Sequence, residues 1–365
     1  MNKKQNCSIE DAAEQSKVVS ARRVSPEYRD VVGATAELLR EYRAHIHSRT
    51  PKNPAEPFEG QILEFSQNLW QDWRAIWSGA ADCLLEITSD SDNLKLAKQY
   101  TEALLTRELL DGPIWWQAYT KPRGYPGDYL VMDHIYNGSP RGETPFGQVV
   151  HTLGIQIGQF VEKRKEFVRQ AITEMVAQCE NPDGMLIASL GCGPAKEIVE
   201  FSQSHLTGTR PLTFVLVDQD SDALRHAGHS ISETLRERQD GPPIDIQLRH
   251  QSVMRLMREV NPSEMMLQPD MIYSAGLFDY FGDRTCRVLS RRLYDALRPG
   301  GLLLLGNMKA NTDMVLPLEL VADWSLTYRT SENVLSWADG LEGAEISLRT
   351  DATGYDYLLS VRKPA

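Results

Sequence analysis

The sequence predicts an α/β protein, in which a mostly parallel β-sheet follows a helical N-terminal region. Three observations support this fold class. Short apolar runs alternate with helical stretches over residues 185–305. A pair of glycines joins the first of these runs to a helix, and the next run ends in an aspartate. No alternating strand pattern precedes residue 150, so the first part of the chain is expected to be helical.

The turn after the first apolar run organises the second half of the chain. The run Met185–Leu190 reads as a buried strand, and Gly191, Cys192 and Gly193 break it. Pro194 then suits a first helical position, because its missing N–H would be unpaired there anyway. Two glycines between a strand and a helix let the backbone turn sharply and let a ligand approach without meeting a Cβ atom.

The second apolar run indicates what that ligand is. The strand predicted over Leu212–Val217 ends in Asp218, about 20 residues beyond the glycines, where a doubly wound fold places a carboxylate on a ribose. Lys196 occupies the position of the third glycine of the dinucleotide fingerprint, which disfavours a pyrophosphate. A nucleoside without phosphate fits better, and S-adenosyl-L-methionine (SAM) is the expected ligand.

The remaining apolar runs complete the predicted sheet. Three more parallel strands are expected at Ile244–Leu248, Asp270–Ser274 and Leu302–Leu305. Helices are expected near 195–205, 221–237, 252–260 and 284–297. This alternation implies crossover helices on both faces of a parallel sheet. The runs at 345–349 and 355–361 flank the turn signal Asp351-Ala352-Thr353-Gly354 and are predicted to form an antiparallel hairpin.

Composition limits the partners and the location. The 365 residues allow two or three domains, and a net charge of -11 argues against binding a nucleic-acid backbone. No stretch approaches the ~20 apolar residues of a membrane span, and the N-terminus has no apolar signal core, so a cytoplasmic location is expected. The five cysteines are scattered without a C-x-x-C pair, so free thiols and no metal site are expected. The oligomeric state stays open.

The first half reads as a series of helices. Residues 1–25 are polar and predicted to be a loosely held arm. Helices are predicted from Pro26 on, through residues 62–77, and over 93–110. Glycine, proline and aromatic residues crowd together at 112–142, which indicates a loop held in one shape. A single long helix is predicted over 145–179.

Several motifs resemble those of one superfamily. SLGCGPAKE, VLVDQD and LYDALRPGGLLLLGNM are similar to the glycine motif, the ribose-binding strand end and the fifth strand of class I SAM-dependent methyltransferases. The resemblance implies a Rossmann-like seven-stranded sheet with an N-terminal helical lid domain. Its domains would be an arm at 1–25, a lid and substrate domain at 26–144, a linking helix at 145–184 and a SAM-binding domain at 185–365.

A narrower resemblance concerns KPRGYPGDYLVMDHIYNG and GLFDYF. These stretches are similar to bacterial methyltransferases that make 3-hydroxypalmitate methyl ester. They also fit a related group of enzymes that cyclise SAM to azetidine-2-carboxylate. The superfamily therefore has two branches that suit this chain, and they differ in the reaction that they catalyse.

The resemblance also assigns cofactor roles by position. Gly191, Cys192 and Gly193 would pass close to the methionine part of SAM, and Asp218 would accept both ribose hydroxyls. The other implied contacts follow the next strand ends: Gln219, Ser252 and Val253 near the adenine, and Ser274, Ala275 and Gly276 beneath the cofactor. Structural alternatives stay open for two of these residues, because Asp218 or Ser252 could instead cap the helix that follows it.

Candidate catalytic residues lie before the sheet. Tyr125, Tyr129 and Tyr136 could face the sulfonium. Asp128 could pair with the cofactor's amino group or simply cap a turn. His151 is a candidate general base, with His134 as the other histidine near the expected pocket, although a structural role is open for either.

A basic run follows these candidates. Lys163, Arg164 and Lys165 lie on the predicted long helix and could bind a substrate carboxylate. A solvated helix face is the reading that we favour for them.

Three functions follow from these observations. The first is SAM-dependent methyl transfer to a carboxylate or hydroxyl of a fatty-acyl or amino-acid-like metabolite. The second is cyclisation of SAM to azetidine-2-carboxylate and methylthioadenosine. The third is a non-catalytic SAM-binding protein. The first is favoured because methyl transfer is the commoner use of this fold, which is an argument from analogy.

Overall fold

The computed structural model describes residues 24–49, 59–78, 80–204, 209–238, 240–258, 268–310 and 314–365. The predicted N-terminal arm therefore lies almost wholly outside the described residues. Contacts divide the chain into a helical unit, Met1–Gly158 with Asn311–Ser325, and a sheet unit, Gln159–Ala310 with Leu326–Ala365. The domain boundaries expected from the sequence stay a prediction.

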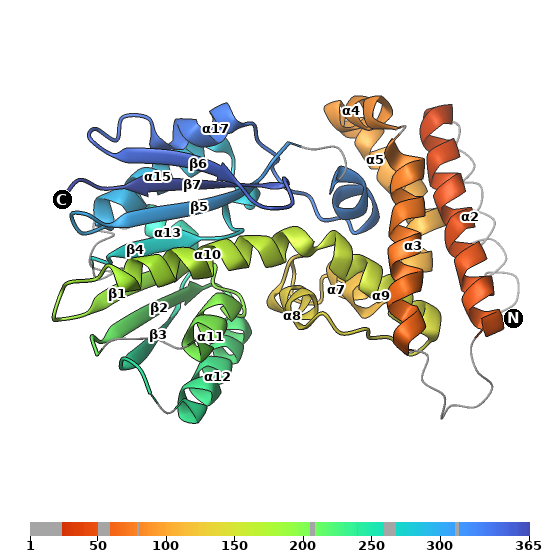
Figure 1. The fold of residues 1–365 in the computed structure, drawn as a ribbon. Helices are drawn as coiled ribbons and strands as arrows, with labels where there is room; N and C mark the ends of the chain where they lie inside the picture. Colours follow the sequence, from red (N-terminus) through yellow and green to blue (C-terminus); the bar gives the residue numbers. More distant parts are fainter. Residues whose placement is uncertain are drawn as a thin grey trace, which may run out of the picture. The chain divides into compact units, whose positions relative to one another are not determined.

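The sheet unit contains a seven-stranded sheet with the order β3-β2-β1-β4-β5-β7-β6 (Figure 1). Its strands are β1 (Met185–Leu190), β2 (Leu212–Asp218), β3 (Ile244–His250), β4 (Met271–Ser274), β5 (Leu302–Met308), β6 (Glu345–Thr350) and β7 (Asp356–Arg362). The first five pair in parallel, and β7 pairs antiparallel with both β5 and β6. This is a Rossmann-like seven-stranded sheet, as the resemblance implies, and it confirms the predicted five parallel strands and terminal hairpin.

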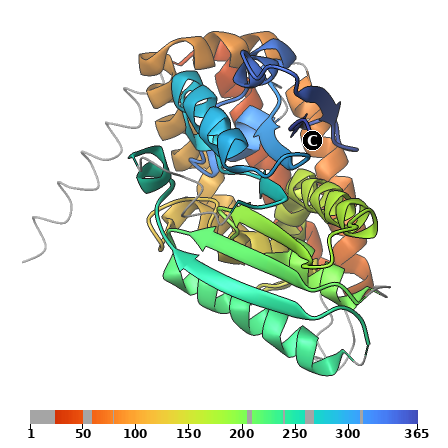
Figure 2. The same ribbon diagram turned by 90° about the vertical axis from the view of Figure 1, so that its left-hand side faces the viewer.

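Two layers of helices cover this sheet (Figure 2). They are α10 (Gln159–Ala177), α11 (Lys196–Gln203), α12 (Ser221–Glu237), α13 (Val253–Arg258), α15 (Asp283–Ala296) and α17 (Ser331–Leu335). Successive strand residues point to opposite faces. Ile187 of β1 accordingly packs in a cluster with residues of α10, α11 and α12, whereas Ala188 packs in a cluster with residues of α13, α15 and α17. Burial on both faces explains why these strands read as continuous apolar runs.

The helical unit is built from helices of the first half of the chain. They are α2 (Pro26–Arg49), α3 (Glu59–Ser78), α4 (Ala81–Ser89), α5 (Ser91–Thr101), the π-helical turn η1 (Glu102–Thr106), α6 (Arg107–Leu109), α7 (Pro113–Thr120), α8 (Tyr129–Asn137) and α9 (Pro145–Ile157). In α2, Tyr28, Val32 and Leu39 recur at helical spacing and are buried. The first two predicted helices are confirmed, and the third is interrupted by the π-helical turn.

Two predictions about this unit are wrong. The segment 112–142 is not one loop, because α7 and α8 lie within it. Some of its glycines and prolines bound helices: Pro113 is the first residue of α7, and Gly138 ends α8 with a φ of 63°. The predicted long helix is also broken, since α9 ends before Gly158 and α10 begins after it. A Cβ atom on Gly158 would lie 2.7 Å from Cδ1 of Ile135.

A segment after β5 returns to the helical unit, although no sequence pattern indicates it. Residues Val315–Val321 form the π-helix η3. Thr106 of η1 donates a hydrogen bond of 2.9 Å from its hydroxyl to the carbonyl oxygen of Val321. None of the described helices combines the length and the apolar character that a membrane crossing requires.

Candidate functional site

The glycine turn adopts a conformation that few residues tolerate. Gly191 and Gly193 have φ angles of 62° and 51°, and Ala195 is left-handed as well, with φ of 49°. The amide of Gly191 donates to the carbonyl oxygen of Val217 at 2.8 Å, which ties the turn to β2. Helix α11 begins only at Lys196, so the predicted helix start at Pro194 is wrong by two residues. A Cβ atom on Gly193 would meet nothing within 4 Å, so this turn borders open space.

Asp218 lies against this turn at the end of β2. Its Oδ2 accepts a 2.9 Å hydrogen bond from the amide of Gly193, and its Oδ1 accepts one of 2.9 Å from the amide of Asp220. Burial raises the pKa of Asp218, and these two amides act in the opposite direction. A carboxylate offers about four lone-pair sites, so both oxygens retain acceptor capacity for a diol.

The helix-capping alternative for Asp218 does not hold, because another residue caps α12. Oδ1 of Asp220 accepts hydrogen bonds from the amides of Asp222 and Ala223. Asp218 is therefore available at the strand end, although it is only 9% exposed. Ser252 does have the helix-capping role, because its hydroxyl accepts a 3.2 Å hydrogen bond from the amide of Met254 in α13.

The other cofactor candidates surround the same edge of the sheet. The hydroxyl of Ser274 donates to the carbonyl oxygen of Leu190 at 3.1 Å, which links the ends of β4 and β1. Gln219 is exposed, and its carbonyl oxygen lies 3.0 Å from Nε2 of His250. Val253 and Cys192 are buried, and burial raises the pKa of the Cys192 thiol. The four described cysteines are free thiols.

A buried charge cluster at this edge was not found from the sequence. Nη1 of Arg164, on α10, lies 3.4 Å from Oδ2 of Asp279 and 3.5 Å from Oδ1 of Asp356. The expectation that Arg164 and Lys165 form a solvated face is wrong, because both are buried and ion-paired. Of the three residues, only Lys163 fits the expected solvated face, because its ion pair with Glu166 is partly exposed.

The two carboxyls of this cluster differ in their surroundings. Asp279 accepts a 2.6 Å hydrogen bond from the amide of Met308 at its Oδ1. Asp356 is fully buried, and its Oδ2 has no hydrogen-bond partner among the described residues. Burial raises the pKa of both groups, to about 6 for Asp279 and to about 8 for Asp356, against the opposing effect of the Arg164 guanidinium. Asp279 itself raises the pKa of Asp356 further.

The catalytic candidates belong to the helical unit, where two of them have clear structural roles. Asp128 is fully buried and caps α8 through hydrogen bonds from the amides of Leu130 and Val131 to its Oδ1. Its Oδ2 accepts a 2.6 Å hydrogen bond from Nε2 of Gln117. His151 is also fully buried, and its Nδ1 accepts a 3.1 Å hydrogen bond from the amide of Ile114 in α7.

The hydrogen bond to His151 fixes its tautomer. Because Nδ1 accepts, the proton of the neutral imidazole is on Nε2. Burial lowers the pKa of His151 to about 3, with a further contribution from His134. The rings of His134 and His151 meet edge to face with centroids 5.0 Å apart. Both imidazoles are therefore neutral near pH 7, since burial lowers the pKa of His134 as well.

The tyrosines of this region are half-buried. Tyr125 lies in the loop between α7 and α8, and Tyr136 lies in the last turn of α8. Arg123 places its guanidinium 5.0 Å from the ring centroid of Tyr129. The loop thus contains a cation–π contact between two of its own residues.

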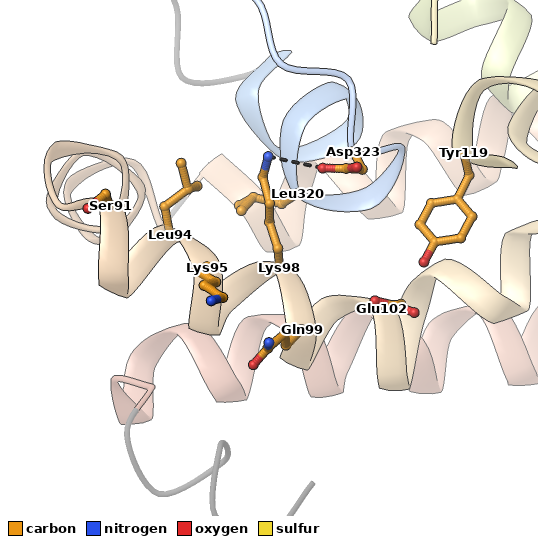
Figure 3. Close-up of a pocket in the computed structure, with 9 residues that line it drawn as sticks. All are labelled: Ser91, Leu94, Lys95, Lys98, Gln99, Glu102, Tyr119, Leu320 and Asp323. Atoms are coloured by element: carbon orange, nitrogen blue, oxygen red, sulfur yellow. Dashed lines mark hydrogen bonds and ion pairs between the residues drawn. The ribbon is translucent and has the colours of Figure 1, made fainter. Parts of the chain in front are cut away.

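The helical unit also has a hollow of about 440 Å³ (Figure 3). Residues of α5, η1, α7 and the 314–325 segment line it, among them Lys98, Glu102, Tyr119 and Asp323. Nζ of Lys98 lies 3.1 Å from Asp323 and 3.6 Å from Glu319, and Lys121 also pairs with Asp323. Two of its charged lining residues, Lys98 and Asp323, are therefore paired with each other. Among the described residues, no group of three acidic, histidine or cysteine side chains could hold a metal ion.

Comparisons with known proteins show the fold. No protein-family model and no curated protein matches the sequence. A solved structure of a possible exported protein from Bordetella parapertussis aligns with 93% of this chain and 99% of its own, at 15% identity and a TM-score of 0.50.

Two methyltransferase structures align less well. Magnesium protoporphyrin IX methyltransferase from Synechocystis PCC 6803 aligns with 67% of this chain and 99% of its own, at 13% identity and a TM-score of 0.44. The N-methyltransferase NodS from Bradyrhizobium japonicum WM9 aligns with 57% and 98%, at 13% identity and a TM-score of 0.37. Likenesses at such low identity concern the fold alone, so activity must be argued from the site.

Proposed function

We propose that this protein is a SAM-dependent methyltransferase that acts on a carboxylate or hydroxyl of a small metabolite, in the cytoplasm. One observation carries the proposal: Asp218 at the end of β2 accepts a hydrogen bond from Gly193 in the left-handed turn after β1. On a sheet of this strand order, that pairing joins a ribose acceptor to a glycine turn that borders open space.

The residues at this edge fit a nucleoside with an uncharged diol. Asp218 keeps acceptor capacity for the hydroxyl groups, and no Cβ atom on Gly193 obstructs an approach to the turn. Gln219 and Ser252 are exposed next to it, where they would contact the adenine. Ser274, Ala275 and Gly276 would lie below the methionine part. When bound, SAM supplies a methyl group that its sulfonium already activates.

The protein's own task is then to position and shield the reactants. A carboxylate acceptor needs no general base at neutral pH, and a hydroxyl acceptor does. Tyr125, Asp128, Tyr136 and His151 remain the proposed catalytic residues, and residues 26–144 the proposed substrate domain. The helix-capping roles of Asp128 and His151 give these two a structural function as well.

Product analysis tests the proposal. The purified protein is incubated with SAM, with and without a metabolite extract, and the adenosyl products are identified by mass spectrometry. We expect S-adenosylhomocysteine (SAH) to form only when an acceptor is present. Methylthioadenosine without an acceptor would instead identify the SAM cyclase, the alternative that the narrower resemblance suggests. SAM binding without either product would identify a non-catalytic binding protein.

A further inference from the structure

The buried cluster of Arg164, Asp279 and Asp356 has more acid than base. One guanidinium lies between two carboxyls, at 3.4 and 3.5 Å. Arg329, the next cation, is paired with Asp283 at 2.7 Å and donates to Oδ1 of Asn307 at 2.6 Å. Arg329 also lowers the pKa of Asp279. If Asp279, Asp356 and Asp283 were all ionised, three carboxylates would face the two guanidiniums, so one negative charge would remain uncompensated, which is costly in a protein interior.

The surroundings show which carboxyl would be neutral. Asp279 is held by the Met308 amide and by Arg164. Asp356 faces Arg164 from α10, Asp279 from the segment after β4, and Asp351 from the turn between β6 and β7. Two of these three groups are acidic, and Oδ2 of Asp356 has no partner in the described part of the chain. Asp356 is thus the group that holds a proton most readily.

The cluster lies at the edge of the sheet where the proposed ligand would bind. Asp356 pairs with Met308, the last residue of β5. A Cβ atom on Gly276 would lie 2.6 Å from Nη2 of Arg164, so the guanidinium packs directly on the segment after β4. Strand β4 separates β5 from β1 and its glycine turn. Asp356 is on β7, the next strand after β5, so three spacings of ~4.8 Å, or about 14 Å, separate it from that turn.

We propose that Asp356 is the internal counter-charge of the site: its carboxyl is protonated in the free protein and releases the proton to water when the sulfonium of SAM binds. This inference rests on the proposed function. A unit charge about 14 Å away, at an effective dielectric constant of about 20, changes an ionisation equilibrium roughly sevenfold. The ligand cation then balances the second carboxylate, so the buried site stays near neutral in both states.

Calorimetry tests this inference. SAM is titrated into the full-length protein near pH 7.5 in two buffers of different protonation enthalpy, and the difference in observed heat gives the number of protons released. We expect the wild type to release roughly half a proton more per bound SAM than Asp356→Asn. The excess should be smaller with SAH, which has the same adenosyl group but no sulfonium charge.

Two further variants complete the design. Asp245→Asn removes an exposed carboxylate from β3, the edge strand on the other side of the sheet, and should release as many protons as the wild type. Asp279→Asn removes the second carboxylate beside Arg164, so Asp356 alone pairs with the guanidinium and should be ionised before SAM binds. The excess proton release should therefore disappear, which tests the inference even if Asp356→Asn does not fold.

Two outcomes would overturn the inference. If SAM binds and Asp356→Asn releases as many protons as the wild type, the counter-charge role of Asp356 is wrong but the proposed function stands. If Asp356→Asn does not fold, the same result with Asp279→Asn leads to the same conclusion. Absence of SAM binding to the wild type would overturn the proposed function together with it.

Discussion

The helical unit and the sheet unit use buried polar groups in different ways. In the helical unit, Asp128 and His151 accept backbone hydrogen bonds that begin α8 and α7. In the sheet unit, Asp218 and Asp356 lie at the end of β2 and the start of β7, with acceptor atoms that the protein itself does not use fully. A buried carboxylate therefore points more clearly to a ligand when its hydrogen bonds are incomplete. His151 shares this property, because its Nε2 has no hydrogen-bond partner among the described residues.

The largest expected effect tests the structural role of Asp128 in the helical unit. Asp128→Ala removes the cap of α8 and leaves Nε2 of Gln117 without its acceptor. We expect the free energy of unfolding to fall by about 2–4 kcal/mol. Urea denaturation measures the loss, with Asn137→Ala on the exposed end of α8 as the control. A variant as stable as the control would contradict the capping role.

The second prediction tests the ligand-binding role of Asp218 with a matched pair of variants. Asp218→Ala should weaken SAM binding by about 1–3 kcal/mol, because it removes charge-assisted hydrogen bonds to the ribose. Asp220→Ala removes the cap of α12 instead, so it should lower stability by about 1 kcal/mol with little change in affinity. Calorimetry measures both affinities. Equal affinity of Asp218→Ala and the wild type would remove Asp218 from the site.

His151 gives a prediction for acid conditions. Its pKa is lowered in the folded protein, so between its folded and unfolded values the unfolded chain binds more protons and stability falls as pH falls. From pH 7 to 5.5 we expect a loss of about 1 kcal/mol from this group. His151→Gln keeps an acceptor for the Ile114 amide and does not titrate. Urea midpoints at both pH values should therefore change less in this variant.

The smallest effect is expected at the ion pairs beside the hollow. Asp323 is partly buried, which opposes ionisation, but Lys121 and Lys98 lower its pKa overall. Because Asp323 remains 46% exposed, Asp323→Asn should cost at most about 1 kcal/mol. The cost should shrink in 0.5 M salt, which screening predicts for exposed charges. A cost that is independent of salt in urea denaturation would rule out an ion-pair origin.

The sequence predicted the sheet unit better than the helical unit for a physical reason. Strands buried on both faces are short apolar runs, and the run Met185–Leu190 matches β1 residue for residue. Helix α12 was likewise predicted with the correct limits, since its apolar positions recur at helical spacing. In the segment 112–142 the same residue types serve loops and short helices, so α7 and α8 were read as one loop.

The candidate site was predicted only where neighbours are close in sequence. The turn at Gly191–Gly193 and its partner Asp218 follow from a fixed spacing between consecutive strands. The partners of Arg164 lie 115 and 192 residues away, and no local pattern encodes such pairs. Charged side chains on a helix face were therefore assigned to solvent, although two of the three are buried.

The segment after β5 has a practical consequence for dissecting the molecule. Val315, Leu316 and Leu320 of this segment are buried, and contacts assign it to the helical unit although it lies more than 150 residues beyond Gly158. An expression fragment that stops at the α9–α10 junction would lose these side chains and expose the apolar surface that they cover. Recombinant work on either unit should therefore begin from the intact polypeptide. Because each unit consists of two separate chain segments, a single proteolytic cut should not separate the two units completely.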